Sequence, residues 1–327
     1  MFLNIVILLV GLALILFGAE LLVNGSSFVA RKFGISEFVV GMTIVGIGTS
    51  APELVVSLIS AINGSSDISV GNIVGSNISN VYLILGLTAL IAPISLTKSN
   101  KKYDLPISIF VSLLLAFLLY DSSICGAEKN MLSRLDGVIL LIIFGLFMFY
   151  SFKLVPKEES SESESQEGNN FYEKVKHPML LAVASILGGL AGLVFGGRFF
   201  VNSGSAIASD LGVSDAFIGI TVMALGTSLP ELAASIVAAA KKKGQMALGN
   251  ILGSNIFNIT LILGVTSVVS PLSPNDITPV DMGVMISTAI LPLLFAIFFN
   301  GKKITRSEGL LFFLIYIGYI FYLSINL

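Results

Sequence analysis

The sequence predicts an all-α polytopic membrane protein of about ten transmembrane helices, arranged as two inverted five-helix repeats. Three observations support this prediction: the hydropathy, an internal repeat and the distribution of basic residues. The chain has 327 residues, of which 55% are hydrophobic and only 12% are charged, and its mean hydropathy is +0.94. A soluble protein of this length needs more charge on its surface, so the composition is typical of an integral membrane protein.

Apolar runs of spanning length alternate with short polar breaks along the chain. The break at 154–177 is longer than the others, acidic and serine-rich, as is typical of a disordered linker. We therefore divide the chain into a first five-helix repeat at 1–153, a cytoplasmic linker at 154–177 and a second five-helix repeat at 178–327. The expected helices are 2–24, 35–61, 68–92, 103–121, 134–153, 178–202, 213–240, 246–270, 280–299 and 307–325.

The two halves are copies of each other, related by a shift of 178 residues. The shift carries Thr49 onto Thr227, since 227 − 49 = 178, and it carries Pro93 onto Pro271. With this shift, 26 of the 60 positions from 34 to 93 are identical to their counterparts. Because each repeat crosses the membrane five times, an odd number, the second must enter from the opposite side.

The basic residues predict the orientation of the chain in the membrane. With the amino terminus outside, the cytoplasmic breaks contain 15 of the 18 basic residues, and only Lys129, Arg134 and Arg198 lie elsewhere. The positive-inside rule therefore places both termini outside and the central linker in the cytoplasm. We expect a multi-pass protein of the cell membrane, with no nucleic-acid partner and no evident protein partner.

A polar hexapeptide interrupts an apolar segment once in each half. It reads G-T-S-A-P-E at 48–53 and G-T-S-L-P-E at 226–231. Ionisable residues within a span are functional candidates, and proline frees a carbonyl that is tolerated only beside an ion or water. In each copy, hydroxyl, carbonyl and carboxylate oxygens can converge on one helix face. They belong to Thr49, Ser50 and Glu53 in the first copy and to Thr227, Ser228 and Glu231 in the second.

A second polar stripe follows each hexapeptide at helical spacing. Ser76 and Asn80, with their counterparts Ser254 and Asn258, lie deep along this stripe, and we favour them as site residues. Two readings remain open for the other amides of the stripe, which either bond across packed helices or contact an ion. These amides are Asn72, Asn77, Asn250 and Asn255.

The rare residues exclude several kinds of site. Cys125 is the only cysteine and His177 the only histidine, so a zinc or copper site is not expected. A bound ion should instead be a hard cation with oxygen ligands. No nucleophile–base pair and no cofactor loop is visible, so we expect neither an enzyme nor a resident cofactor.

The two hexapeptides, each followed by G-N-I-x-G-S-N-I-x-N at 71–80 and 249–258, resemble the two alpha repeats of the sodium/calcium exchanger family, within the calcium/cation antiporter superfamily. The chain is similar to a prokaryotic-type member without regulatory domains. The resemblance implies a calcium site on Glu53 and Glu231, with the main-chain carbonyls of Thr49 and Thr227. It also implies sodium positions or site lining at Ser50, Ser76, Ser228, Ser254, Asn80, Asn258, Gly46 and Ala224.

The resemblance implies that Na⁺ is exchanged for Ca²⁺ by alternating access, with both ions as transported substrates. Exchange of three Na⁺ for one Ca²⁺, as the family implies, would be electrogenic. Potassium-dependent relatives carry Asp at the position of Asn258, whereas Asn80 and Asn258 are both amides here, so we expect potassium independence. The alternatives are a Ca²⁺/H⁺ antiporter, a K⁺-dependent Na⁺/Ca²⁺ antiporter and, with less support, a cation channel.

The first and sixth helices lie outside these motifs and contain many glycines, so we nominate them as the moving pair. Glu20 and Arg198 occupy equivalent positions in these two helices and carry opposite charges. They form either a salt bridge with each other or two separate anchors at the membrane interface.

Overall fold

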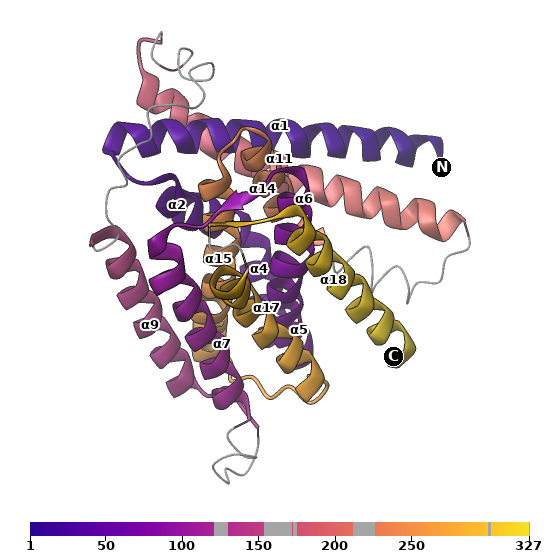
Figure 1. Ribbon diagram of the computed structural model, residues 1–327. Coiled ribbons are helices and arrows are strands. Elements are labelled where there is room, and N and C mark those ends of the chain that lie inside the picture. Colours follow the sequence, from indigo (N-terminus) through magenta and orange to yellow (C-terminus); the bar gives the residue numbers. More distant parts are fainter. Residues whose placement is uncertain (121–129, 154–171, 173–174, 212–225, 300–301, 327) are drawn as a thin grey trace.

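The computed structural model describes residues 1–120, 130–153, 172, 175–211, 226–299 and 302–326 (Figure 1). The first half contains eight described α-helices and three π-helical segments, which are marked η. They are α1 (Phe2–Phe33), α2 (Glu37–Val40), η1 (Gly41–Val45), α3 (Gly46–Thr49), α4 (Ala51–Ile62), α5 (Ser66–Ile78), η2 (Ser79–Leu85), α6 (Gly86–Ile91), η3 (Asn100–Asp104), α7 (Leu105–Leu119) and α9 (Arg134–Lys153).

The described part of the second half repeats this order. Its helical segments are α11 (Pro178–Asp210), α14 (Leu229–Ala240), α15 (Gly244–Phe257), η5 (Asn258–Leu263), α16 (Gly264–Val269), α17 (Pro279–Phe298) and α18 (Arg306–Asn326). Two short strands, β1 (Ile94–Ser95) and β2 (Lys303–Ile304), pair antiparallel.

The spanning segments confirm the predicted all-α polytopic architecture. Within the described residues, eight helices are long and apolar enough to cross a membrane, and the bent pair of 37–49 and 51–62 makes a ninth. The predicted helix at 213–240 is described only from residue 226 onward, and its regular part is α14.

The first helix of each half is longer than predicted. α1 ends at Phe33 rather than at residue 24, and α11 ends at Asp210 rather than at residue 202. The small polar residues after position 24 resemble a helix end in the sequence, but Gly25 packs so closely that a Cβ there would lie 2.8 Å from the carbonyl oxygen of Ala182. α1 is instead capped by Gly34, where φ is 63° and a side chain would be strained.

α1 and α11 lie side by side and run across the direction of the other helices (Figure 1). Glycines allow the two backbones to approach closely. A Cβ on Gly18 would lie 2.8 Å from the oxygen of Gly189, and one on Gly11 would lie 2.9 Å from the oxygen of Gly196. The 178-residue shift exchanges these two contacts, so this helix pair lies on the two-fold axis of the repeat.

Two short backbone contacts are also exchanged by the repeat. β1 pairs with β2 through Ile94 and Ile304, and an isolated bridge joins Leu132 to Leu272. The shift is 178 residues for the first members (272 − 94) and 172 residues for the second members (304 − 132). One backbone contact between the repeats therefore lies near each end of the bundle, as expected for inverted copies.

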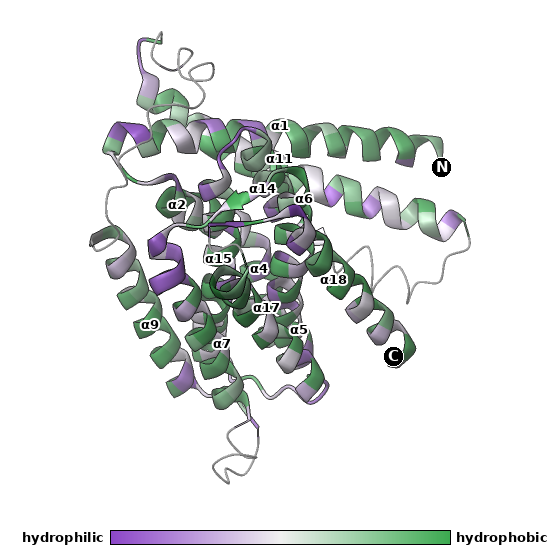
Figure 2. Cartoon of the chain, in the orientation of Figure 1, coloured by the Kyte–Doolittle hydropathy of each residue, from purple (hydrophilic) through white to green (hydrophobic). Residues whose placement is uncertain are grey.

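The polar stripes lie in the centre of the molecule. The windows of the spans at 66–91 and 244–269 are 83% buried, whereas that of the span at 134–152 is only 22% buried. The outer helices α1, α9 and α18 are hydrophobic over most of their length (Figure 2). The central helices therefore bury their polar side chains against each other, and the outer helices present apolar side chains outward.

Candidate functional site

Two helix breaks bring the hexapeptides into the interior. The first lies at Ser50, where ψ is 6° and the helix axis bends by 44°. The second lies at Ser228, where ψ is 1°. The motif proline falls in the first turn of the helix that follows each break, at Pro52 in α4 and Pro230 in α14. A proline is tolerated there because first-turn N–H groups have no partner within the helix.

The breaks place both motif glutamates at the first turns of α4 and α14, facing inward. Glu53 and Glu231 are each only 1% exposed. Negative groups are favoured at helix N-termini, which offset part of the cost of burying these carboxylates. A buried carboxylate nevertheless requires a partner of opposite charge or several hydrogen-bond donors.

The carboxylate of Glu231 is bonded by a hydroxyl group of the opposite repeat. The Ser50 hydroxyl lies 3.0 Å from Glu231 Oε1 and also 3.0 Å from the hydroxyl oxygen of Ser254. The carboxylate of Glu53 lies beside the side chains of Thr227, from the second repeat, and Ser76, from its own repeat. Each half of the site is thus completed by residues of the other repeat.

Four buried acceptor oxygens in this region have no hydrogen-bond donor among the described residues. They are Oε2 of Glu53, Oε2 of Glu231, Oδ1 of Asn80 and Oδ1 of Asn258. Burial of unpaired acceptors is unfavourable by roughly 1–3 kcal/mol each, and by more for charged groups. A hard cation bound among these oxygens would serve as their missing partner, since such cations are bound by carboxylate, carbonyl and hydroxyl oxygens.

The two free amide oxygens are held in place by a clasp of four asparagines across the repeats. Asn77 and Asn255 each donate from Nδ2 to the backbone oxygen of the other, over 3.2 Å. Asn80 donates to Oδ1 of Asn255, and Asn258 donates to Oδ1 of Asn77, over 2.9 Å in both cases. These bonds use the amide nitrogens of Asn80 and Asn258 and leave their oxygens unpaired.

Asn72 and Asn250 position the helices that carry the glutamates. Asn72 Nδ2 donates to the backbone oxygen of Glu53 and to the hydroxyl of Ser57, and Asn250 makes the equivalent bonds to Glu231 and Ser235. Asn250 also accepts a bond from the Thr49 hydroxyl over 3.2 Å. For these two amides, and for Asn77 and Asn255, the geometry shows bonding across helices.

The structure brings together most of the residues predicted for the site. The buried ones are Thr49, Ser50, Glu53, Ser76, Asn80, Ser228, Glu231, Ser254 and Asn258. Thr227 is half-buried beside Glu53. The Gly46 backbone lies against α15, but its carbonyl already accepts bonds from Ser50 N and the Thr49 hydroxyl. Ala224 lies outside the described residues.

Ser79 joins the site although the sequence did not single it out. Its hydroxyl lies 3.1 Å from that of Ser228. The residue has no serine counterpart in the second repeat, where Phe257 stands. It also opens the π-helical segment η2, and such segments are frequent at functional sites. Only its place one residue before Asn80 could have suggested a role.

Glu20 and Arg198 do not form a salt bridge with each other. Glu20 Oε1 instead lies 2.7 Å from the ammonium nitrogen of Lys241, in the loop between α14 and α15. Of the two readings of this opposite-charge pair, the mutual salt bridge is therefore wrong.

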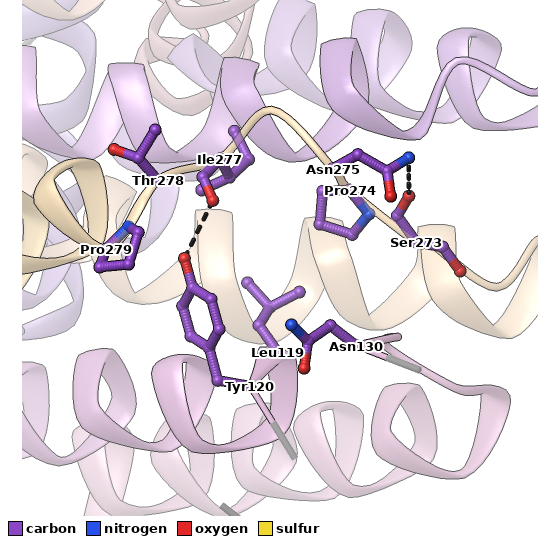
Figure 3. Close-up of a pocket in the computed structure, with 9 residues that line it drawn as sticks. All are labelled: Leu119, Tyr120, Asn130, Ser273, Pro274, Asn275, Ile277, Thr278 and Pro279. Atoms are coloured by element: carbon purple, nitrogen blue, oxygen red, sulfur yellow. Dashed lines mark hydrogen bonds between the residues drawn. The ribbon is translucent and has the colours of Figure 1, made fainter. Parts of the chain in front are cut away.

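A cavity of about 710 Å³ has neither of the buried glutamates in its lining. Figure 3 shows the residues that line it. The cavity lies between the end of α7 and the segment that precedes α17, where the Tyr120 hydroxyl donates to the backbone oxygen of Ile277 over 2.9 Å. The described lining contains no ionised side chain. Its chemistry is thus unlike that of the glutamate site, which contains two carboxylates.

Comparison with known proteins gives the family of the chain. The family model described as sodium/calcium exchanger protein matches residues 3–153 and 181–325. Sodium/calcium exchanger MaX1 of Methanosarcina acetivorans is 33% identical over 97% of this chain and 97% of its own length. Inner membrane protein YrbG of Escherichia coli is 35% identical over 89% of this chain and 88% of its own length.

A solved structure has the same fold. The sodium-calcium exchanger NCX_Mj, soaked with 10 mM Na⁺ and zero Ca²⁺, matches with a TM-score of 0.80 and 35% identity over 97% of both chains. The family match includes both hexapeptides and both asparagine stripes. The chain therefore belongs to the sodium/calcium exchanger family, a family of membrane cation/Ca²⁺ antiporters rather than enzymes.

Proposed function

We propose that this protein exchanges Na⁺ for Ca²⁺ by alternating access, electrogenically and without a requirement for K⁺. The observation that carries the proposal is the set of four unpaired, buried oxygens on Glu53, Glu231, Asn80 and Asn258. Two carboxylates contribute a charge of about −2, which one Ca²⁺ balances without a further anion. The ions are substrates in this proposal, and no resident cofactor takes part.

The proposed calcium ligands are the carboxylates of Glu53 and Glu231 and the main-chain carbonyls of Thr49 and Thr227. Calcium accepts a flexible shell of carboxylate, carbonyl and hydroxyl oxygens, which suits this mixed set. Sodium ions would use overlapping oxygens, so the two loads would compete. The proposed sodium or lining positions are Ser50, Ser76, Ser228, Ser254, Asn80, Asn258, Gly46 and Ala224.

Potassium independence is proposed because the centre of the site offers amides rather than a third carboxylate. Asn80 and Asn258 are held by the asparagine clasp with their oxygens facing the site. A neutral pair at this place leaves the charge of the site at about −2, which one Ca²⁺ balances by itself, so charge balance requires no K⁺ beside Ca²⁺.

Alternating access is proposed to arise from movement of α1 and α11 against the helices that carry the site. These two long helices pack mainly on each other, and their glycine contacts contain few interlocking side chains. The repeats that they belong to are residues 1–153 and 178–327, joined by the linker at 154–177. We place both termini outside the cell membrane and the linker in the cytoplasm, as the distribution of basic residues favours.

The proposal is tested by ⁴⁵Ca²⁺ flux in proteoliposomes with Na⁺, K⁺ and H⁺ gradients imposed separately. We expect an outward Na⁺ gradient to drive Ca²⁺ uptake, with no requirement for K⁺ on either side. Uptake that follows only the pH gradient would instead indicate a Ca²⁺/H⁺ antiporter. Uptake that requires Na⁺ and K⁺ together would contradict potassium independence, and single-channel currents would contradict a carrier.

A further inference from the structure

Two lysines of the loop between α14 and α15 bond to one face of α1. The Lys241 ammonium nitrogen lies 2.7 Å from Glu20 Oε1 and 3.0 Å from Asn24 Oδ1. Lys243 donates to the hydroxyl of Ser27. The three acceptors lie at i, i+4 and i+7, and therefore on one face of α1. We call this set of five side chains the α1 latch.

The equivalent place in the other repeat has no such ion pair. The 178-residue shift relates Lys241 to Asn63, and Glu20 to Arg198. An asparagine and an arginine cannot reproduce the bond between an ammonium and a carboxylate. The counterpart of Ser27 is Ser205, whose buried hydroxyl has no partner among the described residues. The latch therefore acts at one end of the bundle only.

One residue of the loop between α14 and α15 has a left-handed backbone conformation that is unfavourable for a residue with a side chain. Lys242 has φ 62° and is the only non-glycine residue with positive φ in the described part of the chain. Its repeat counterpart is Gly64, with φ 79°, where no side chain resists this conformation. Retained backbone strain is a sign of a functional role, because an unstrained alternative is available in the same fold.

The packing of the two long helices also differs between the repeats. α1 packs along α14, and almost all of its residues between 22 and 30 are buried. Among the described residues, α11 shows no comparable packing against α4, and Ser203 is its only buried residue between 199 and 208. Among the described residues, α1 thus covers the end of the bundle that carries the latch, whereas α11 does not cover the opposite end in the same way.

We propose that the α1 latch sets the sidedness of ion access, by stabilising the state in which the path at the cytoplasmic end of α14 is closed. This inference rests on the proposed exchange function and on the proposed orientation. An exposed ion pair changes an equilibrium by no more than about fivefold. The latch therefore acts as a bias between two states and leaves both accessible.

The bias predicts a change in apparent affinity on one face of the membrane. The apparent dissociation constant equals the intrinsic dissociation constant divided by the fraction of protein in the binding-competent state, so a smaller fraction means weaker apparent binding. Removing the Lys241 charge in Lys241→Gln should raise the fraction that is open to the cytoplasm. The half-saturating Ca²⁺ concentration at the cytoplasmic face should then fall about two- to fivefold, with little change at the outer face.

The test is Na⁺-driven ⁴⁵Ca²⁺ flux in right-side-out and inside-out vesicles, each titrated with Ca²⁺. Glu20→Gln should act like Lys241→Gln, and the charge swap Glu20→Lys with Lys241→Glu should restore the original sidedness. Lys243 is a poorer test, because burial lowers the pKa of its ammonium group to about 8 and its substitution would also alter packing.

Two further variants use the repeat as a control. Arg198→Gln, at the position equivalent to Glu20, should leave the half-saturating concentration at the cytoplasmic face unchanged. Arg198→Glu combined with Asn63→Lys should install a latch at the other end and weaken Ca²⁺ binding at the outer face. Normal exchange with unchanged sidedness in both Lys241→Gln and Glu20→Gln would refute the latch alone. Absence of Na⁺-driven flux in the unsubstituted protein would refute the exchange function, and the latch with it.

Discussion

At the scale of single residues, the distinguishing feature of the candidate site is a set of buried oxygens that have no hydrogen-bond donor in the part of the chain that the structure describes. Glu53 and Glu231 each have one carboxylate oxygen with no hydrogen-bond donor among the described residues, and Asn80 and Asn258 have unpaired amide oxygens. The other carboxylate oxygen of Glu231 is bonded by the Ser50 hydroxyl. The bonded atoms orient the side chains, and the unbonded atoms remain available. A site of this kind is held in shape before an ion arrives, so ion binding needs little reorganisation.

We expect Glu231→Gln to abolish Ca²⁺ transport, because an amide halves the charge of the site and offers donors where acceptors are required. In detergent, saturating Ca²⁺ should raise the thermal unfolding midpoint of the unsubstituted protein, since 100 times the Kd of a ligand adds about 2.7 kcal/mol to the free energy of unfolding. The variant should fold but should lose this Ca²⁺-dependent shift.

Asp210→Asn is the matched control for this prediction. Asp210 is an exposed carboxylate at the end of α11, and it pairs with the amino terminus over 3.6 Å rather than with any residue of the candidate site. It undergoes the same change of carboxylate to amide. Near-normal uptake is expected for Asp210→Asn, and near-normal uptake in Glu231→Gln would show that the site has been assigned incorrectly.

At the scale of elements, the fold depends on where helices are broken and how they end. The breaks at Ser50 and Ser228 aim the first turns of α4 and α14 inward. The turn after α4 is closed by Gly64, in a left-handed conformation with open space around its Cα. Any cost of a side chain at this position therefore arises from the backbone rather than from a clash.

We expect Gly64→Ala to lower the free energy of unfolding by about 1 kcal/mol, because the left-handed region is unfavourable for residues with a Cβ. Gly145→Ala is the matched control, since Gly145 lies within α9 and a Cβ there has open space. That substitution should raise stability by about 0.5–1 kcal/mol through helix propensity. Thermal unfolding in detergent measures both, and an equal response of the two variants would contradict the assigned backbone conformation.

At the scale of the whole molecule, the two repeats share one site but are not in equivalent positions. The asparagine clasp and the glycine contacts of α1 with α11 follow the two-fold relation closely. The latch at Glu20 and Lys241 does not. A two-fold centre with unequal ends suits a carrier that presents the same site to two sides with different probabilities.

Electrogenic exchange is a property of the whole cycle, and we expect it to appear as a voltage dependence. If three Na⁺ exchange for one Ca²⁺, one net charge crosses the membrane per cycle. A potential of 100 mV is worth about 2.3 kcal/mol per charge, or roughly a fiftyfold change in the steady-state Ca²⁺ ratio. Proteoliposomes clamped with K⁺ and valinomycin measure this ratio, and a ratio independent of the potential would indicate electroneutral exchange.

Much of the fold was predictable from the sequence because its signals are local or repeated. Hydropathy located the spans, the 178-residue shift gave the inverted copies, and proline located the breaks. The ends of α1 and α11 were wrong because glycine and serine occur both in loops and at close helix contacts. Only the packing partner, such as Ala182 facing Gly25, distinguishes the two cases.

The sequence by itself indicated most of the oxygen-bearing residues of the candidate site, since both copies of each motif are visible in it, but it did not indicate Ser79, which has no serine counterpart in the second repeat. The tertiary structure alone decided their roles. It assigned Asn77 and Asn255 to the clasp, left the oxygens of Asn80 and Asn258 unpaired, and paired Glu20 with Lys241. The physical reason is that a hydrogen bond depends on which helices are adjacent, and residues about 180–220 positions apart become neighbours only when the two repeats pack together.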